Sequence, residues 1–99
     1  MTNHNKIDPQ SLEDKYHDMK RLIESLTTSL KAFEDHYDDY LILRHFYGSE
    51  EWYQAIEQRN KVHLKADILS EDLLYNLIVE HNQLIERFLD LTAKMYKHL

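Results

Sequence analysis

Histidine is the residue type with which this chain could most readily hold a metal ion, because seven of its 99 residues are histidines. Zinc sites on helices use pairs such as His-x-x-x-His, and di-iron bundles use Glu-x-x-His motifs on two helices. The histidines fit neither pattern and are scattered along the chain as His4, His17, His36, His45, His63, His81 and His98. We therefore expect no metal ion and no other cofactor.

Nucleophilic catalysis and phosphate binding find equally little support in the residue types. The chain has no cysteine, so it forms no disulfide, no thiolate metal site and no cysteine nucleophile. One glycine is too few for a glycine-rich phosphate loop. Helix capping or a helix surface explains the serines at Ser25, Ser29, Ser49 and Ser70. We expect that the protein is not an enzyme.

Charge limits the classes of partner. The formal net charge is −6 and no run of Lys or Arg occurs, so we expect no nucleic-acid binding. Asp35, Asp38 and Asp39 are spaced i, i+3, i+4, which places them in one outward patch on a helix. Such a patch is either a solvated face or a docking surface for a basic partner. No segment approaches the about 20 apolar residues that span a membrane, so we expect a cytoplasmic protein without membrane contact.

The elements that must hold these residues are helices. One Gly and one Pro leave too few turn residues for a many-stranded fold. With Asp8 or Ser11 as the N-cap and Pro9 in the first turn, a first helix is predicted over residues 9–47. Its apolar residues recur at alternating steps of four and three, a heptad seam formed by Leu12, Tyr16, Met19, Ile23, Leu26, Leu30, Phe33, Tyr37 and Tyr40.

A corner follows this helix at the only glycine. Gly48 can adopt the left-handed conformation that ends a helix, and Ser49 can cap a short helix over about residues 50–58. Trp52 and Ile56 share a face of the short helix, and we expect Trp52 to pin the corner to the core. Residues 58–68 lose the helical periodicity and indicate a loop.

A last helix is predicted over residues 70–97. Ser70 is its N-cap, Glu71 and Asp72 suit the positive end of a helix, and Leu69 and Leu74 occupy the positions of a hydrophobic staple. The two long helices should pack antiparallel as a hairpin with the short helix between them, in an all-α, bundle-like fold. The predicted facing pairs are Tyr40 with Leu77, Tyr37 with His81, and Leu43 or Arg44 with Leu74.

Two residues of the first helix are left over in this hairpin. Leu12 and Tyr16 lie beyond the end of the last helix and have nothing in the chain to pack on. An apolar stripe left in water usually marks an interface, so we expect a homodimer that completes the bundle. If the first helix frays before residue 18, no second chain is needed. In this interpretation residues 1–8 are a flexible N-terminus and residues 9–99 form a single helical domain.

Two polar residues fall on the seams. His81 is either a buried neutral imidazole with one hydrogen-bond partner or a pH sensor. Arg44 either snorkels and pairs with Asp72 or another acid near the last helix, or it fixes the register of packing. None of these roles is catalytic.

Two segments together resemble a known family. "YGSEEW" at residues 47–52 and "ILSEDLLYNLI" at 68–78 are similar to segments of domain of unknown function 4298, a family of short proteins found mainly in Gram-positive bacteria. The resemblance covers residues 25–97 and departs from the family at Lys61 and Asp67, where Pro and Gly are usual. It implies the fold and a bacterial origin, but no activity. The positions that it carries over are Tyr47, Gly48, Ser49, Trp52, Leu69, Ser70, Glu71 and Asp72.

The function that fits these observations is protein–protein interaction. The leading hypothesis is a non-catalytic cytoplasmic protein that binds a protein partner through its helix faces. A small acidic inhibitor or immunity-type protein, binding a toxin or a nucleic-acid-handling enzyme through the acidic patch, is the alternative. A small enzyme or metal-binding helical bundle has the least support.

Overall fold

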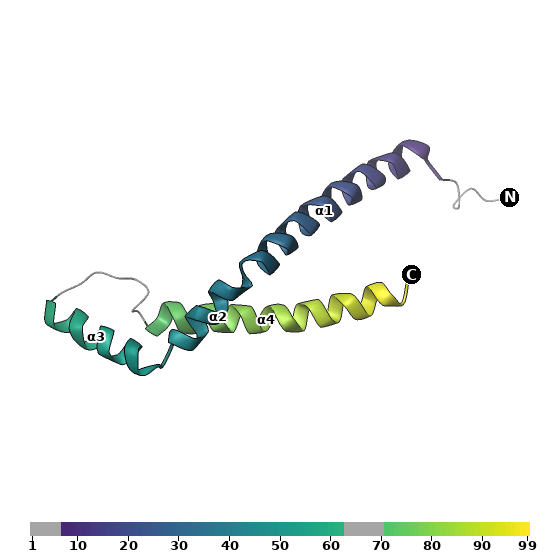
Figure 1. Cartoon of the computed structure of the whole chain (residues 1–99). Helices are drawn as coiled ribbons and strands as arrows, with labels where there is room; N and C mark the ends of the chain where they lie inside the picture. Colours follow the sequence, from purple (N-terminus) through teal and green to yellow (C-terminus); the bar gives the residue numbers. More distant parts are fainter. Residues whose placement is uncertain (1–6, 63–70) are drawn as a thin grey trace. The chain divides into compact units, whose positions relative to one another are not determined.

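A computed structural model of the chain describes residues 7–62 and 71–99, which form four α-helices and no strand (Figure 1). The helices are α1 (Pro9–Asp35), α2 (Tyr37–Phe46), α3 (Glu50–Val62) and α4 (Glu71–Tyr96). The predicted all-α class is therefore confirmed. No helix within these residues has the length and the apolar character needed to cross a membrane.

The chain divides into two units, an N-terminal unit over Met1–Asp38 and a C-terminal unit over Asp39–Leu99. Helix α1 lies in the N-terminal unit, whereas α3, α4 and most of α2 lie in the C-terminal unit. The expected pairing of the first helix, up to Tyr37, with the last helix would join the two units and stays a prediction. The single domain over residues 9–99 and the homodimer stay predictions as well.

Helix α1 begins as its sequence predicts. The side chain of Asp8 accepts a hydrogen bond of 3.2 Å from the backbone N–H of Gln10, and Pro9 occupies the first turn. The backbone carbonyl of Asp8 accepts from the N–H of Leu12 at 3.1 Å, which is the first bond of the helical ladder. Asp8 is therefore the N-cap, and Ser11 is not.

The expected helix over residues 9–47 is divided at His36. The φ and ψ angles of His36 are −107° and 7°, and α2 begins at the next residue. Two groups of His36 converge on the carbonyl oxygen of Ala32: the backbone N–H at 3.1 Å and the ring Nδ1 at 2.9 Å. A side chain that contacts the ladder of its own helix is a known cause of a helix break.

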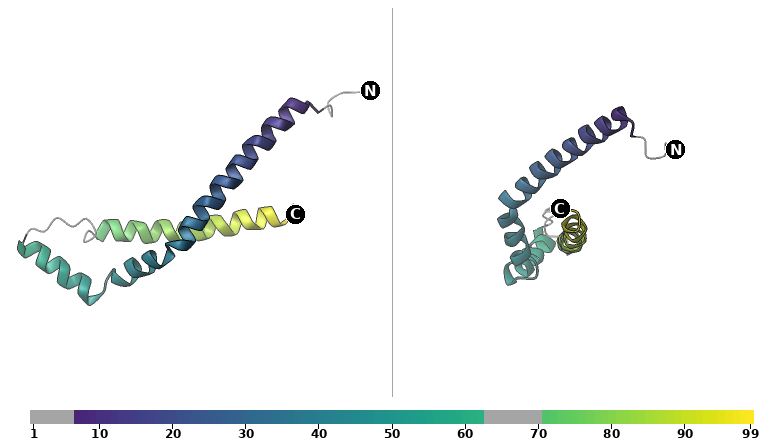
Figure 2. Two further views of the ribbon diagram at one scale, coloured as in Figure 1. Left: turned by 45° about the horizontal axis from the view of Figure 1, so that its top comes forward. Right: turned by 90° about the vertical axis from the view of Figure 1, so that its right-hand side faces the viewer.

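The core of the C-terminal unit is small and is formed by side chains of its three helices, the ribbons of which Figure 2 shows in two views. Among the described residues, the buried side chains are Trp52 of α3 and Leu74 of α4. Side chains of α2, the corner and α3 pack against this pair and are half-buried: Leu43, Phe46, Tyr47, Ala55 and Ile56. The contact of Leu43 with this cluster agrees with the predicted pairing of Leu43 and Leu74.

Tyr40 of α2 contacts a residue of α4 that the sequence did not predict as its partner. The rings of Tyr40 and His81 stack with centroids 3.9 Å apart and an interplanar angle of 7°. The prediction placed Tyr40 against Leu77, which lies one turn earlier on α4. Since Leu43 contacts the Leu74 cluster as predicted, the stack does not show a shift of the whole helix.

Helix α3 corresponds to the short helix that was predicted to end near residue 58. It continues to Val62. Its last turns contain Gln58, Arg59 and Lys61, which favour helix even without an apolar face. Helix α4 begins at Glu71 and ends at Tyr96, close to the predicted bounds. The expected staple residue Leu69 and the expected N-cap Ser70 lie outside the described residues.

Candidate interaction surfaces

The corner between α2 and α3 is built by the family motif residues Tyr47, Gly48 and Ser49. The N–H of Tyr47 donates to the carbonyl of Leu43 at 3.0 Å, and the N–H of Ser49 donates to the carbonyl of Phe46 at 3.0 Å. Gly48 has a φ of +76°, the left-handed conformation that the sequence predicted for it. A Cβ atom at Gly48 would meet no atom within 4 Å, so only the backbone conformation requires glycine here.

Trp52 connects this corner to the core. Its side chain is 3% exposed, and its ring centroid lies 5.1 Å from the rings of Tyr47 and Tyr53. The indole Nε1–H is buried and has no hydrogen-bond partner among the described residues. Two further motif residues lie at the start of α4. They are Glu71, with which the helix begins, and Asp72, the side chain of which is exposed. Tyr47, Gly48, Ser49 and Trp52 thus build the corner, whereas a structural role of Glu71 and Asp72 stays a prediction.

A continuous apolar surface follows one face of α1. We call it the α1 stripe and define it as Leu12, Tyr16, Met19, Ile23, Leu26, Leu30 and Phe33. Every side chain of the stripe is between 40% and 57% exposed, and α1 has no buried residue. Leu12 and Tyr16 are as exposed as the rest of the stripe, and their position beyond the end of the last helix stays a prediction.

The α1 stripe contains a hollow of about 470 Å³ lined by Tyr16, Met19, Lys20, Ile23 and Glu24. Four of these residues have the spacing i, i+3, i+4, i+7. In coiled coils, four residues of one helix surround the hole that receives a side chain of the facing helix. The amino group of Lys20 lies 6.0 Å from the centroid of the Tyr16 ring, at the edge of the hollow.

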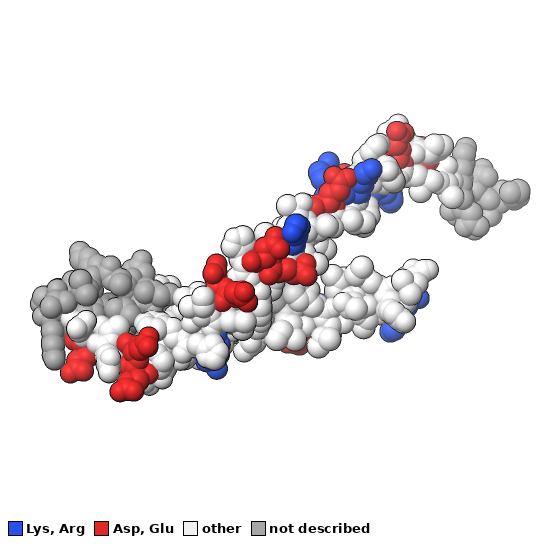
Figure 3. All heavy atoms as spheres, in the orientation of Figure 1, with Lys and Arg blue, Asp and Glu red and all other residues white. Residues whose placement is uncertain are grey.

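The outward face of α1 carries ion pairs within the helix. Arg21 pairs with Asp18 at 2.5 Å, and Lys31 pairs with Asp35 at 3.0 Å. Figure 3 shows acidic and basic side chains next to one another along α1, between areas of uncharged surface. Exposed pairs of this kind add only a few tenths of a kcal/mol each, so their main effect is to keep the outward face polar.

The three aspartates of the expected acidic patch are divided between the two units of the chain. Asp35 and Asp38 belong to the N-terminal unit and Asp39 to the C-terminal unit, and all three side chains are exposed. Lys31 offsets the charge of Asp35. That the three carboxylates act as one docking surface therefore stays a prediction.

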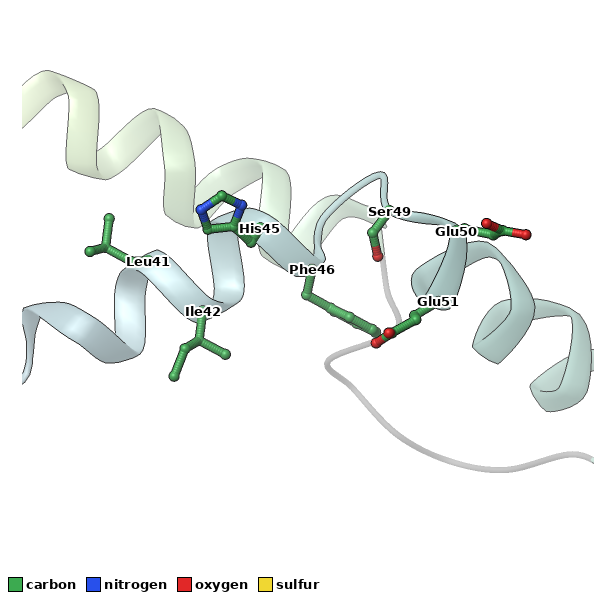
Figure 4. A pocket seen from close by; sticks show the side chains of 7 residues that line it. All are labelled: Leu41, Ile42, His45, Phe46, Ser49, Glu50 and Glu51. Carbon is green, nitrogen blue, oxygen red and sulfur yellow. The ribbon is translucent and has the colours of Figure 1, made fainter.

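Sequence reasoning missed a pocket at the corner of α2 and α3 (Figure 4). It has a volume of about 570 Å³, and Figure 4 shows the ring of Phe46 directed toward the carboxylate of Glu51. Ile42 could have indicated this pocket in the sequence, because it is an apolar residue that lies off the heptad seam. In the structure its side chain is 66% exposed. The lining residues are Leu41, Ile42, His45, Phe46, Ser49, Glu50 and Glu51.

Neither polar seam residue forms an arrangement with evident chemistry. His81 stacks on Tyr40, and its Nδ1 lies 3.0 Å from Oδ1 of Asn82. Arg44 and Asp72 are both exposed and do not form the predicted ion pair with each other. Within the described part of the chain, no three histidine, aspartate or glutamate side chains come together as a metal site.

Comparison with known families agrees with the motif resemblance. A family model described as "Domain of unknown function (DUF4298)" matches residues 10–91. The chain belongs to this family. The DUF4298 match includes nearly all of α1, the corner at Gly48, the Trp52–Leu74 cluster and α4 as far as Leu91. Among curated proteins, none matches this sequence.

Proposed function

We propose that this DUF4298 protein is non-catalytic and acts by binding another protein chain through the α1 stripe. The observation that supports the proposal is a helix of 27 residues without a single buried side chain. Most of the stability of a helix in a protein comes from burial of its amphipathic face. Helix α1 makes no such contact within the N-terminal unit, and in our proposal a partner chain supplies it.

The shape of the α1 stripe favours a helical partner. Its side chains recur at alternating steps of three and four residues. The residues that line its hollow have the spacing of those that surround a coiled-coil hole, which accepts one side chain. An amphipathic helix that binds along a groove or seam presents its anchors at the same spacing. The chain has no cysteine, which fits a reducing compartment, and we place the interaction in the cytoplasm.

An acidic inhibitor or immunity-type protein is the other candidate function. The observation that favours it is that Asp38 and Asp39 are exposed and form no ion pair among the described residues. Such carboxylates could bind a basic partner. Contacts between exposed charges weaken as salt screens them, whereas apolar helix contacts persist, so salt dependence separates the two functions.

Capture of partners by matched variants tests the proposal. Leu26→Lys adds a charge in the middle of the α1 stripe, and Thr28→Lys adds the same charge two residues away on the outward face. Tagged wild type and both variants are used to capture proteins from a lysate of the source cell, at low and at moderate salt. Bound proteins are quantified by mass spectrometry.

The proposal predicts a bound protein that wild type and Thr28→Lys retain at both salts and that Leu26→Lys loses. Circular dichroism of the two variants must show equal helix content, so that the loss reports contact and not unfolding. A partner that all three proteins bind equally, or that moderate salt removes from all three, would contradict binding through the α1 stripe. The second outcome would favour the acidic surface.

A further inference from the structure

We infer that the partner of the α1 stripe is the α1 stripe of a second copy of this chain, with the two helices antiparallel. This inference rests on the proposed function, because it names the occupant of the same surface. Two observations carry it: the size of the stripe and the spacing of its hollow.

The size of the α1 stripe matches that of a stable interface. Its seven side chains are each about half exposed. With about 200 Å² for a large side chain, the value typical of aromatic residues, they offer roughly 700 Å² per copy. Stable protein interfaces bury about 800 Å² per partner. One helix face from each of two copies is therefore close to sufficient.

The α1 stripe is complementary to itself. The hollow formed by Tyr16, Met19, Lys20 and Ile23 has the spacing i, i+3, i+4, i+7. The same spacing recurs one heptad later at residues 23, 26, 27 and 30, where Leu26 and Leu30 again supply apolar walls. A two-fold dimer needs one surface that offers both the inserted side chains and the holes that receive them. The α1 stripe offers both.

Helix dipoles favour the antiparallel orientation. The charged residues next to the seam are Glu13, Lys15 and Lys20 in its first half and Glu34 near its end. In a parallel pair in register, edge residues five positions apart face each other, which would place Lys15 against Lys20 of the second copy on both edges. An antiparallel pair separates these lysines, although it brings Glu13 of one copy near Glu34 of the other. It also aligns the helix dipoles favourably.

The antiparallel register that covers most of the α1 stripe is centred between Ile23 and Leu26. It places Tyr16 opposite Phe33 of the second copy. Every member of the stripe from residue 16 to residue 33 then has an apolar side chain opposite it. A copy of α1 alone covers the stripe except Leu12, which lies opposite Tyr37 of α2.

Cysteine cross-linking tests both the partner and the orientation, because the chain has no cysteine of its own. Three single variants are made: Tyr16→Cys, Phe33→Cys and, as a control on the outward face, Thr28→Cys. Each is oxidised alone, and Tyr16→Cys is also mixed with a tagged Phe33→Cys protein. A disulfide forms only when the two Cα atoms are about 4.4–6.8 Å apart.

The inference predicts a disulfide between the two chains in the mixture, and none in any of the three variants alone. In the antiparallel register the two copies of residue 16 are roughly 25 Å apart, at 1.5 Å per residue along the axis. Homodisulfides of both Tyr16→Cys and Phe33→Cys would show a parallel pair and overturn the inference. Equal cross-linking of Thr28→Cys would show random collision and would also overturn it.

Sedimentation of the wild-type chain separates failure of this inference from failure of the proposed function. The inference requires a mass about twice the 12.0 kDa of the chain at micromolar concentration. A monomer at all concentrations overturns the inference. If the lysate capture then still shows a partner that depends on Leu26, the α1 stripe binds a different protein and the proposed function stands.

Discussion

The hydroxyl of Ser49 accepts a hydrogen bond of 3.1 Å from the backbone N–H of Trp52, the side chain of which is buried in the core. One residue thus caps α3 and holds the core tryptophan at the first turn. Ser49→Ala should lower the free energy of unfolding by about 1 kcal/mol, because the Trp52 N–H loses its acceptor. Urea denaturation followed by the fluorescence of Trp52, the only tryptophan, measures this change.

Two variants make the capping prediction specific. Ser49→Asp retains an acceptor and should unfold within about 0.5 kcal/mol of wild type. Ser25→Ala, on the exposed surface of α1, should also change stability by less than about 0.5 kcal/mol. If Ser49→Asp is as unstable as Ser49→Ala, the hydroxyl does not act as the cap.

Substitution of Gly48 should cost only what its backbone conformation costs. Gly48 has a φ of +76°, and a Cβ atom added there would have no atom within 4 Å. Gly48→Ala should therefore lose about 1–2 kcal/mol from the left-handed conformation alone. Gly48→Asn should lose less, because Asn tolerates this conformation better than other residues. Equal losses for Ala and Asn, measured by the same urea titration, would point to a steric contact that the structure does not show.

Truncation of Trp52 should be the most destabilising change in the C-terminal unit. Trp52→Ala leaves a cavity beside Leu74 and should cost about 3–5 kcal/mol. Trp52→Phe keeps an aromatic ring and removes the buried Nε1–H that lacks a partner among the described residues, so it should cost less than half as much. Thermal unfolding followed by circular dichroism suits both variants. A loss below about 0.5 kcal/mol for Trp52→Ala would contradict its place in the core.

The stack of Tyr40 on His81 should contribute measurable coupling between α2 and α4. A double-mutant cycle with Tyr40→Leu, His81→Leu and the double variant should give a coupling energy of about 0.5–1.5 kcal/mol. The matched cycle uses Tyr75→Leu with Tyr53→Leu, two exposed tyrosines on α4 and α3, and should give a value near zero. A Tyr40–His81 coupling no larger than this control would show that the stack adds no stability.

The sequence could predict the helices and the corner because both depend on local chemistry. The heptad seam from Leu12 to Tyr40 identifies a helix and its apolar face, and Asp8, Pro9, Gly48 and Ser49 determine where helices begin and end. The break at His36 could not be predicted in this way, because the seam continues across it from Phe33 to Tyr37. It depends on the contact of one imidazole with a carbonyl of its own helix.

The packing of α2 against α4 shows a second limit of periodicity. A seam defines which face of a helix is apolar, but it does not define which side chains of the facing helix each residue touches. The stack of Tyr40 with His81 was not predicted, whereas the contact of Leu43 with the Leu74 cluster was. Within the candidate interaction surface, Leu12 and Tyr16 were predicted to bind a second chain, and the pairing of the other stripe residues with the last helix stays a prediction.

Amide hydrogen exchange at two protein concentrations tests the pairing of α1 stripes most directly, because it reports which helix a second copy covers. We predict that backbone amides of residues 12–33 exchange more slowly at high than at low concentration, since pairing opposes opening of α1. Amides around Trp52 and Leu74 should exchange equally at both. Exchange in α1 that does not depend on concentration, or protection that appears in the C-terminal unit instead, would contradict the pairing of α1 stripes.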